Sequence, residues 1–571
     1  MKKLGMGMGV VFWALLMFVF SVVSVVGMWV IWGRMVCVEV KVVGVSAEML
    51  DVLMVLDVVS LSFMSLVFFI SSCVLFYSVS YMGSDEMSSR LVGLMVVFVF
   101  SMVLLILFPS LLGLILGWDG LGLSSFLLVV FYQNDNALAS GMITALSNRI
   151  GDGLLITSMG MCLGSGHWNS FFEMSWLVGV FVGLASITKS AQVPLRAWLP
   201  AAMAAPTPVS SLVHSSTLVT AGVYLLLRYG VVAEMADILL VLSSMTLILG
   251  GVSALFEGDV KKVVALSTLS QLGMMVFVVS LGFKVFCLFH LYMHALLKAS
   301  LFLAVGAIIH ARNEQDINFL SGSILDSPGS SAVVVVSCGA LSGIPFLCGW
   351  FSKDVILEVL LGGVSWVYSF ILFLGVVSSV IYSGRLVWMC VFSPVGFAPM
   401  NQSADCKVML ASMWLLLLGV VFGGPFFYYW LGVESVVVVN EFDKFVGLVI
   451  IGFGCLFVFN WFTQRVKYVN WKESKKEFFC SQLWLDFCKM MWFLPLLSGE
   501  VGIGMLKLGN ASFVYLEQGW MEFFGGKGAK EIWGVFFSLH QRMQMGGMNL
   551  TLTVMSLSFF VIVVGVGVNY C

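Results

Sequence analysis

The stretch ITKSAQVPLRAWLPAAMAAPTPVSSLVHSSTLVTAG, residues 187–222, decides the fold because it interrupts an apolar membrane segment and places a charge at the interruption. Lys189 ends an apolar run, and Pro194 then removes a backbone N–H and prevents a straight helix. In hydrocarbon, each unpaired backbone group costs several kcal/mol unless it faces protein or water. These residues predict a broken helix with a polar interior, and they make Lys189 a candidate proton-transfer residue.

A new helix is expected after the break, with Thr207 as its cap and Pro208 at its first position. His214 then lies about 9 Å further along the helix axis. Three hydroxyl side chains share the face of its imidazole: Ser210, Ser211 and Thr217. They predict a histidine beside water that takes part in proton transfer. The alternative is a histidine that hydrogen-bonds a neighbouring helix.

The composition is that of a membrane protein. The 571 residues are 60% hydrophobic and only 10% charged, which excludes a soluble protein with one buried core. The formal net charge of -2 argues against a nucleic-acid partner. The 12 cysteines show no CxxC or Cys/His spacing, so no metal site or disulfide framework is expected.

Apolar spans of about 20 residues recur along the chain, and each is long enough to cross a bilayer as a helix. They are too long for barrel strands, so the predicted fold class is an all-α polytopic membrane protein with about fifteen transmembrane helices. The first span is too long for the apolar part of a signal peptide. The spans lie roughly at 8–32, 54–79, 91–108, 110–132, 137–163, 175–193, 208–229, 238–256, 263–283, 285–310, 331–350, 361–392, 408–430, 443–462 and 550–569.

A second interruption lies in SCGALSGIPFLCGWFSKD, residues 337–354, where glycine and proline break an apolar span beside Lys353 and Asp354. Paired breaks in the two halves of a membrane protein indicate inverted repeats with sites near the bilayer midplane. The predicted domains are N-terminal helices 1–109, a first repeat 110–230, a second repeat 238–392, additional helices and a basic loop 408–479, and a C-terminal segment 480–571.

The C-terminal segment is expected to leave the helical bundle. Residues 499–546 mix charges with large apolar side chains, which is typical of an amphipathic surface helix. Residues 550–568 are apolar and predict a final transmembrane anchor. The basic stretch 465–476 favours the matrix-like face of the membrane.

An acidic residue inside the span 110–132, Asp119, must pair, protonate or contact water. Lys189 is the natural partner, because two charges about 4 Å apart interact by about 4 kcal/mol at an effective dielectric constant near 20. A change in their separation would then capture or release a proton. A static structural ion pair is the alternative. Arg149 and Asp152 are three residues apart on one helix and are expected to satisfy each other in a supporting role.

The span 285–310 carries His290, His294 and Lys298 at four-residue spacing, which places them on one helix face over about 12 Å. This row suits proton hopping better than helix–helix hydrogen bonding alone. A separate loop cluster is expected to be solvated and mutually paired: Glu257, Asp259, Lys261 and Lys262. No dinucleotide fingerprint, P-loop or cluster-binding cysteine set is present, so oxidoreduction is expected only in other proteins.

Four motifs carry a resemblance to a known family: GWDGLGLSSFLLVVFYQN (117–134), ALSNRIGDG (145–153), KSAQVPLRAWLPAAMAAPTPVSSLVHSSTLVTAGVYLL (189–226) and FHLYMHALLKASLF (289–302). They resemble the antiporter-like membrane subunits of respiratory complex I, in particular the NADH-ubiquinone oxidoreductase chain 5 family of invertebrate mitochondria. The resemblance is strong over residues 50–395 and rests on layout alone in the C-terminal arm.

The resemblance implies an input pair, Asp119 and Lys189, a central axis with His214 and Lys298, and a terminal site at Lys353. The supporting residues are Arg149, Asp152, His290, His294 and Asp354. Many relatives carry Glu where this chain has Asp119, and the shorter side chain has less reach toward Lys189.

The resemblance also implies a multi-pass subunit of the mitochondrial inner membrane that contacts lipid and the neighbouring antiporter-like subunits. No cofactor is expected in this chain, whereas FMN, iron–sulfur clusters and ubiquinone are expected in other subunits. Two alternatives are the large subunit of a multisubunit cation/proton antiporter and a passive assembly subunit.

Overall fold

The structure is a computed structural model that describes residues 2–45, 48–83, 85–165, 176–230, 232–363, 365–393, 405–432, 441–468, 486–489, 491–545 and 547–568. The chain divides into two compact units, Met1–Pro495 and Leu496–Cys571. In the described residues, ten helices are long and apolar enough to cross a membrane. The prediction of a mostly helical multi-pass membrane protein is therefore confirmed. The number fifteen and the finer domain boundaries stay predictions.

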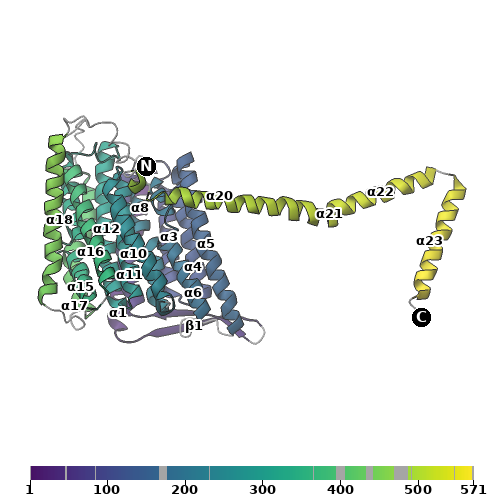
Figure 1. Ribbon diagram of the computed structural model, residues 1–571, viewed down its shortest axis with the longest axis horizontal. Helices are drawn as coiled ribbons and strands as arrows, with labels where there is room; N and C mark the ends of the chain where they lie inside the picture. Colours follow the sequence, from purple (N-terminus) through teal and green to yellow (C-terminus); the bar gives the residue numbers. More distant parts are fainter. Residues whose placement is uncertain are drawn as a thin grey trace. The chain divides into compact units, whose positions relative to one another are not determined.

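The first unit is a bundle of helices that run side by side, with the strand β1 across one end (Figure 1). Its N-terminal part contains α1 (Lys2–Val30), β1 (Val36–Val45), β2 (Glu48–Leu56), α2 (Val58–Tyr81), α3 (Ser88–Leu107), α4 (Leu111–Val129), η1 (Val130–Tyr132), α5 (Asp135–Ser165) and α6 (Trp176–Lys189). Its centre contains α7 (Trp198–Ala201), η2 (Ala202–Ala204), α8 (Thr207–Ser215), α9 (Leu218–Tyr229), α10 (Val232–Phe256), α11 (Val260–Ser280) and α12 (Lys284–Arg312). The rest is α13 (Ser323–Asp326), α14 (Pro328–Ser342), α15 (Cys348–Gly363), α16 (Trp366–Val387), η3 (Trp388–Phe392), α17 (Lys407–Trp430) and α18 (Glu441–Tyr468).

The antiparallel hairpin of β1 and β2 was not part of the sequence prediction. Its register pairs Val36 with Leu56 and Val45 with Glu48. The segment is rich in Val, which favours a strand. The next helix, α2, begins with a capping box in which Asp57 accepts from the Ser60 backbone and Ser60 accepts in return.

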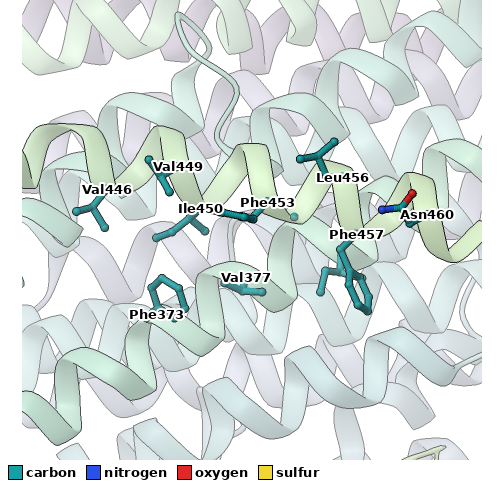
Figure 2. A pocket seen from close by; sticks show the side chains of 11 residues that line it. Phe373, Val377, Val446, Val449, Ile450, Phe453, Leu456, Phe457 and Asn460 are labelled. Atoms are coloured by element: carbon teal, nitrogen blue, oxygen red, sulfur yellow. The ribbon is translucent and has the colours of Figure 1, made fainter.

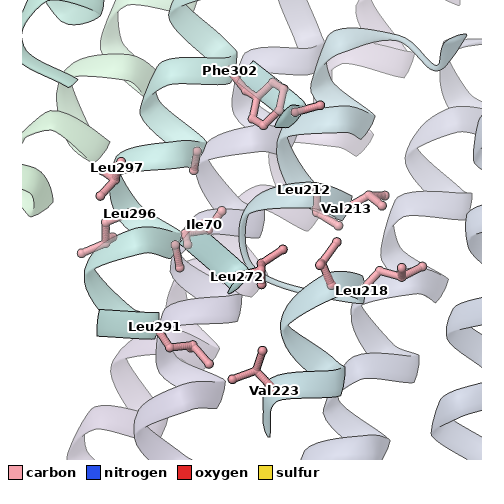
Figure 3. Close-up of a cluster of buried hydrophobic side chains, with 14 of the residues drawn as sticks. Ile70, Leu212, Val213, Leu218, Val223, Leu272, Leu291, Leu296, Leu297 and Phe302 are labelled. Atoms are coloured by element: carbon pink, nitrogen blue, oxygen red, sulfur yellow. The ribbon is translucent and has the colours of Figure 1, made fainter. Parts of the chain in front are cut away.

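The helix α12 runs through the middle of the bundle, and every residue from Phe286 to Ile309 is buried. The helices α8, α9 and α11 pack around it and are almost fully buried as well. Figure 3 shows Leu212, Val213, Leu218 and Phe302 in the apolar cluster that these helices share. Polar side chains between Phe286 and Ile309 are therefore shielded from the outside of the bundle by the surrounding helices.

The first break falls where it was predicted, because α6 ends at Lys189 and regular helix returns at Trp198. Two details of the prediction are wrong. Thr207 lies inside the first turn of α8, and the cap position belongs to Pro206. The expected single helix 208–229 is interrupted again at Ser216 and Thr217, where the Thr217 hydroxyl donates to the carbonyl of Leu212. A side chain that competes for backbone carbonyls in this way can end a helix.

The second break also falls as predicted, between α14 and α15. Gly343 ends α14 with a φ of +92°, a conformation that favours glycine. Gly349 opens α15, and a Cβ there would meet the carbonyl oxygen of Ala340 at 1.8 Å. The two half-helices thus pack so closely that only glycine fits.

The second unit and the segment that leads into it contain α20 (Leu494–Ser512), η5 (Phe513–Met521), α21 (Glu522–Phe524), α22 (Gly526–Met545) and α23 (Met548–Val568). The predicted surface helix 499–546 is helical almost throughout and exposes large apolar side chains, such as Leu506 (68%) and Trp533 (61%). Residues 550–568 are helical, as expected, and their role as a membrane anchor stays a prediction. Residues 469–476 of the predicted basic stretch lie outside the described residues.

Candidate functional site

Lys189 is completely buried at the end of α6. Its Nζ donates a hydrogen bond of 2.8 Å to the carbonyl oxygen of Trp118 in α4, and it lies 4.3 Å from the centroid of the Trp118 ring. The break brings α6 close to α9, where a Cβ on Gly222 would meet the Ser190 nitrogen at 2.9 Å. Neutral groups therefore hold the amine directly, and the ring stabilises its charged form.

The predicted direct pair of Asp119 with Lys189 is not formed. The cation nearest to Asp119 is Arg149 of α5, whose Nη1 lies 3.9 Å from the carboxylate. The same nitrogen donates at 3.1 Å to Asp152, so the predicted pair of Arg149 and Asp152 is confirmed. Successive residues on a helix point in different directions, so the backbone of Trp118 reaches Lys189 while the side chain of Asp119 turns toward α5. Asp152 and then Asp119 act on Lys189 through charge.

His214 is buried in the last turn of α8, directly before the interruption at Ser216. Its ring lies between Trp198 and Phe302, with centroid distances of 6.3 and 6.4 Å. Its Nδ1 has no hydrogen-bond partner among the described residues.

The hydroxyls predicted to surround this histidine do not bind it. Ser210, Ser211 and Thr217 each donate to a backbone carbonyl of their own segment. These hydroxyls therefore do not supply a hydrogen-bond partner for the Nδ1 of His214.

The row on α12 is confirmed as one buried stripe of titratable side chains. The rings of His290 and His294 lie 6.4 Å apart, and the Nδ1 of His290 is 2.9 Å from the hydroxyl of Ser352. Lys298 donates to the hydroxyl of Ser267 on α11. Neither nitrogen of His294 has a hydrogen-bond partner in the part of the chain that the structure describes. A neutral imidazole has one N–H donor and one acceptor nitrogen, so both functions of His294 lack a described partner.

Lys353 lies one turn into α15 and reaches back across the second break. Its Nζ donates to the carbonyl of Leu341 in the last turn of α14, and to the hydroxyl of Ser379 at 3.2 Å. A cation there complements the negative end of α14. Asp354 points the other way, toward α18, where its Oδ1 would lie 2.1 Å from a Cβ on Gly447.

Several partners of the site escaped the sequence prediction. Trp118, Ser267, Ser352 and Ser379 each contact a predicted proton-transfer residue. Because Trp118 is next to Asp119 in the chain, the sequence could have suggested it as a contact of the site. The serines could not be recognised in this way, because serine is common in membrane helices. Arg196 is completely buried in the first break, and its Nη2 donates at 2.6 Å to the carbonyl of Met491. A contact with a residue so distant in the chain is invisible in the sequence.

The loop cluster before α11 is paired as predicted, with one exception. Lys262 lies 2.6 Å from Asp259 and 3.7 Å from Glu257. Burial raises the pKa of Asp259, but the hydrogen bond and charge of Lys262 outweigh it and hold this pKa below its ordinary value. Lys261 is buried rather than solvated, because α11 already begins at Val260 and turns this side chain into the bundle.

A cavity of about 820 Å³ lies between α16 and α18. Phe373 and Val377 face Ile450 and Phe453 across it, and Asn460 lies at its end (Figure 2). This apolar groove contains none of the predicted proton-transfer residues. Within the described ranges, no group of three or more His, Cys, Asp or Glu side chains could hold a metal ion.

Two broken helices that hold buried lysines, joined by a buried histidine–lysine stripe, define an antiporter-like multi-pass membrane protein. Residues 109–381 match the family described as "NADH:quinone oxidoreductase/Mrp antiporter, TM", and residues 382–566 match "NADH dehydrogenase subunit 5 C-terminus". The chain belongs to the NADH-ubiquinone oxidoreductase chain 5 family.

Relatives of that name support this assignment. The protein of Anopheles gambiae is 41% identical over 508 residues, covering 86% of both chains. The protein of Locusta migratoria is 40% identical over 507 residues, covering 85% of this chain and 86% of its own. The protein of Mytilus edulis is 39% identical over 510 residues, covering 86% of this chain and 87% of its own.

Two solved structures share the fold. The chain is similar to a chain in the Mrp complex from Dietzia sp. DQ12-45-1b, with a TM-score of 0.65 and 22% identity, covering 100% of this chain and 63% of that chain. It is also similar to a chain in the membrane-bound sulfane sulfur reductase, an archaeal respiratory membrane complex. The TM-score is 0.65 at 17% identity, covering 79% of this chain and 97% of that chain.

Proposed function

We infer that this chain is a proton-translocating membrane-arm subunit of respiratory complex I in the mitochondrial inner membrane. The names of its relatives and the match of its C-terminal third to the subunit 5 family support complex I over a free-standing cation/proton antiporter. FMN, iron–sulfur clusters and ubiquinone in other subunits would supply the oxidoreduction that drives it. The neighbouring antiporter-like subunits and membrane lipid would be its partners.

One observation carries the proposal. Lys189, Lys298 and Lys353 are exposed by 0%, 0% and 4%, and in the described residues none of their amines forms an ion pair with a carboxylate. A structural lysine in a membrane is normally paired, because an uncompensated buried ammonium is costly. An amine held only by carbonyls and hydroxyls can take up or release a proton when a neighbouring charge changes.

The proposed path follows the buried groups in order. The acids Asp119 and Asp152 with Arg149 bias the charge on Lys189. Protons then pass by His214 to Lys298, and by His294 and His290 to Lys353, beside Asp354. Moving each proton outward against 100 mV requires about 2.3 kcal/mol, which the oxidoreduction in other subunits would supply through electrostatic changes along this axis.

The test compares Lys298→Met and Lys298→Arg with Lys262→Met in the assembled complex reconstituted in liposomes. Arginine keeps the positive charge but does not release its proton. Both changes at residue 298 should abolish proton uptake during NADH oxidation, whereas Lys262, which lies in the surface cluster, should be replaceable. Normal proton uptake in Lys298→Arg would overturn the proposal. Loss of assembly with unchanged coupling in the remainder would favour a passive assembly subunit.

A further inference from the structure

A line of hydroxyl groups leads from one end of the bundle toward His214, and the path described above does not use it. Tyr81 ends α2 and is partly buried, whereas Tyr77, one turn earlier, is completely buried. The hydroxyl of Thr207, at the start of α8, lies near that of Tyr77, and the rings of Tyr77 and Tyr81 stack with their centroids 5.6 Å apart. Yet neither the Tyr77 nor the Thr207 hydroxyl makes a well-formed hydrogen bond to any described residue. Buried polar groups are normally satisfied, so two adjacent exceptions need a reason.

Gly306 of α12 makes room for these hydroxyls. A Cβ at this position would lie 2.8 Å from the Thr207 Oγ1 and 3.1 Å from the Tyr77 hydroxyl. The three helices α2, α8 and α12 therefore meet at this glycine, where both hydroxyl groups and the Cβ of Thr207 face it. Any larger residue at 306 would press on both of them.

The outer end of this line reaches the surface. The ring of Tyr81 lies 5.1 Å from that of His310, which is exposed two residues before the end of α12. The exposed Asp85 acts on Tyr81 through its charge. An imidazole and a carboxylate at the rim can collect protons from water and pass them to a neighbouring hydroxyl.

The inner end reaches the site. On α12, Lys298, Phe302, Gly306 and His310 follow one another at four-residue spacing, so neighbours in this series share a face. Phe302 packs against the ring of His214. Gly306, one helical turn further along α12, packs against Thr207. Thr207 and His214 are seven residues apart on α8, about 10 Å along one face.

Ser210 and Ser211 lie on α8 between Thr207 and His214. Each hydroxyl donates to a backbone carbonyl and keeps its lone pairs as acceptors. The unpartnered Nδ1 of His214 completes the series.

We propose that Tyr81, Tyr77 and Thr207 form a hydroxyl relay that carries protons between the membrane surface at His310 and the buried imidazole of His214. In each step one hydroxyl oxygen accepts a proton and gives its own to the next oxygen, so every O–H bond that breaks is replaced by one that forms. The net result is one proton fewer at the surface and one more on His214, and nothing is oxidised or reduced. The relay rests on the proposed function, since it supplies or drains the proposed proton axis.

The test measures proton uptake per NADH oxidised by the complex in liposomes, normalised to assembled complex. Tyr77→Phe and Thr207→Val each remove one relay oxygen while nearly keeping side-chain shape, and should lower proton uptake by about tenfold. Thr207→Ser keeps the hydroxyl and should restore uptake. Gly306→Ala should act like Tyr77→Phe, because its methyl group displaces both hydroxyls. The matched control is Ser300→Ala on α12, whose hydroxyl is satisfied by the carbonyl of Leu297 and which should behave as wild type.

The outcomes separate the relay from the proposed function. If Lys298→Met abolishes uptake while Tyr77→Phe and Thr207→Val retain it, the relay is wrong and the proton axis stands. If Lys298→Met itself pumps normally, the proposed function fails first. Equal losses in Thr207→Val and Thr207→Ser would also overturn the relay, because they would show that residue 207 acts through packing rather than through its hydroxyl.

Discussion

Lys189 and Lys353 are both buried at helix breaks, but they stand on opposite sides of them. Lys189 ends the half-helix before its break and donates to a carbonyl of another helix, α4. Lys353 lies in the half-helix after its break and donates back to the last turn of α14, the other half of its own pair. Asp152 and Asp119 act on Lys189 through charge, whereas Asp354, the carboxylate next to Lys353 in the chain, points toward α18.

The difference indicates two ways to control a buried amine. A lysine near two carboxylates and an arginine binds its proton more or less strongly when one of these side chains moves or changes charge. For a lysine that binds the carbonyl end of a helix, proton binding by the amine depends instead on the helix dipole and on the distance across the break. We therefore expect the first break to respond to charge in neighbouring elements, and the second to respond to its own geometry.

Replacing either lysine by methionine should have the largest effect. Lys189→Met and Lys353→Met should each reduce proton uptake per NADH by about a hundredfold or more, because each removes a proton acceptor from the path. Reconstituted complex with a pH-sensitive dye in the liposome interior measures this. A normal ratio in one variant alone would show that only one break carries protons.

Close packing at the breaks should have the next largest effect, and on stability. Gly222→Ala places a Cβ 2.6 Å from the carbonyl of Ser186, and Gly349→Ala places one 1.8 Å from the carbonyl of Ala340. Each should destabilise the chain by about 3 kcal/mol, since backbone cannot move aside as a side chain can. Thermal unfolding of the detergent-solubilised complex measures the loss.

Gly339→Ala is the matched control for these two glycines. Its Cβ would meet only the flexible side-chain ends of Ile344, at 3.1 Å, and Leu347, at 3.5 Å, so a loss of less than about 1 kcal/mol is expected. An equal loss in all three variants would show that helix propensity, rather than the close approach of the half-helices, explains the glycines.

Neutralising an acid should sharpen the contrast between the breaks. Asp152→Asn removes the carboxylate that acts most strongly on Lys189 and should slow proton uptake by about tenfold. Asp354→Asn offers the comparison, because Asp354 turns toward α18 and away from Lys353. If Asp354→Asn is as slow as Asp152→Asn, both breaks are controlled by carboxylates and the distinction fails.

Loss of one hydroxyl at the second break should have the smallest effect. Ser379→Ala removes one of the two acceptors of the Lys353 amine and leaves the Leu341 carbonyl in place. We expect proton uptake to fall by about threefold, the kinetic equivalent of one weak hydrogen bond. An unchanged rate of proton uptake would show that the carbonyl end of α14, and not the Ser379 hydroxyl, determines how Lys353 behaves.

The sequence predicted the buried histidine–lysine stripe of α12 and the two helix breaks. It did not predict which residues contact the charged side chains there. The spacing of His290, His294 and Lys298 predicts one helix face, and the structure confirms it. The interruption at Ser216 and Thr217 was missed, because neither glycine nor proline marks it. The structure does not bring Asp119 and Lys189 into direct contact, because the Asp119 side chain turns toward Arg149 of α5, and the sequence does not show which way α4 turns.

By itself, the sequence determined that the chain is a mostly helical multi-pass membrane protein, where its two breaks lie, and which charged residues lie inside them. These follow from local rules: hydrocarbon excludes charge, proline breaks a helix, and four residues make about one turn. Only the tertiary structure decided that Trp118 and Leu341 accept from the two lysines, and that the Tyr77 and Thr207 hydroxyls meet at Gly306. Those contacts depend on how each helix is rotated against its neighbours, which the packing of the whole bundle sets.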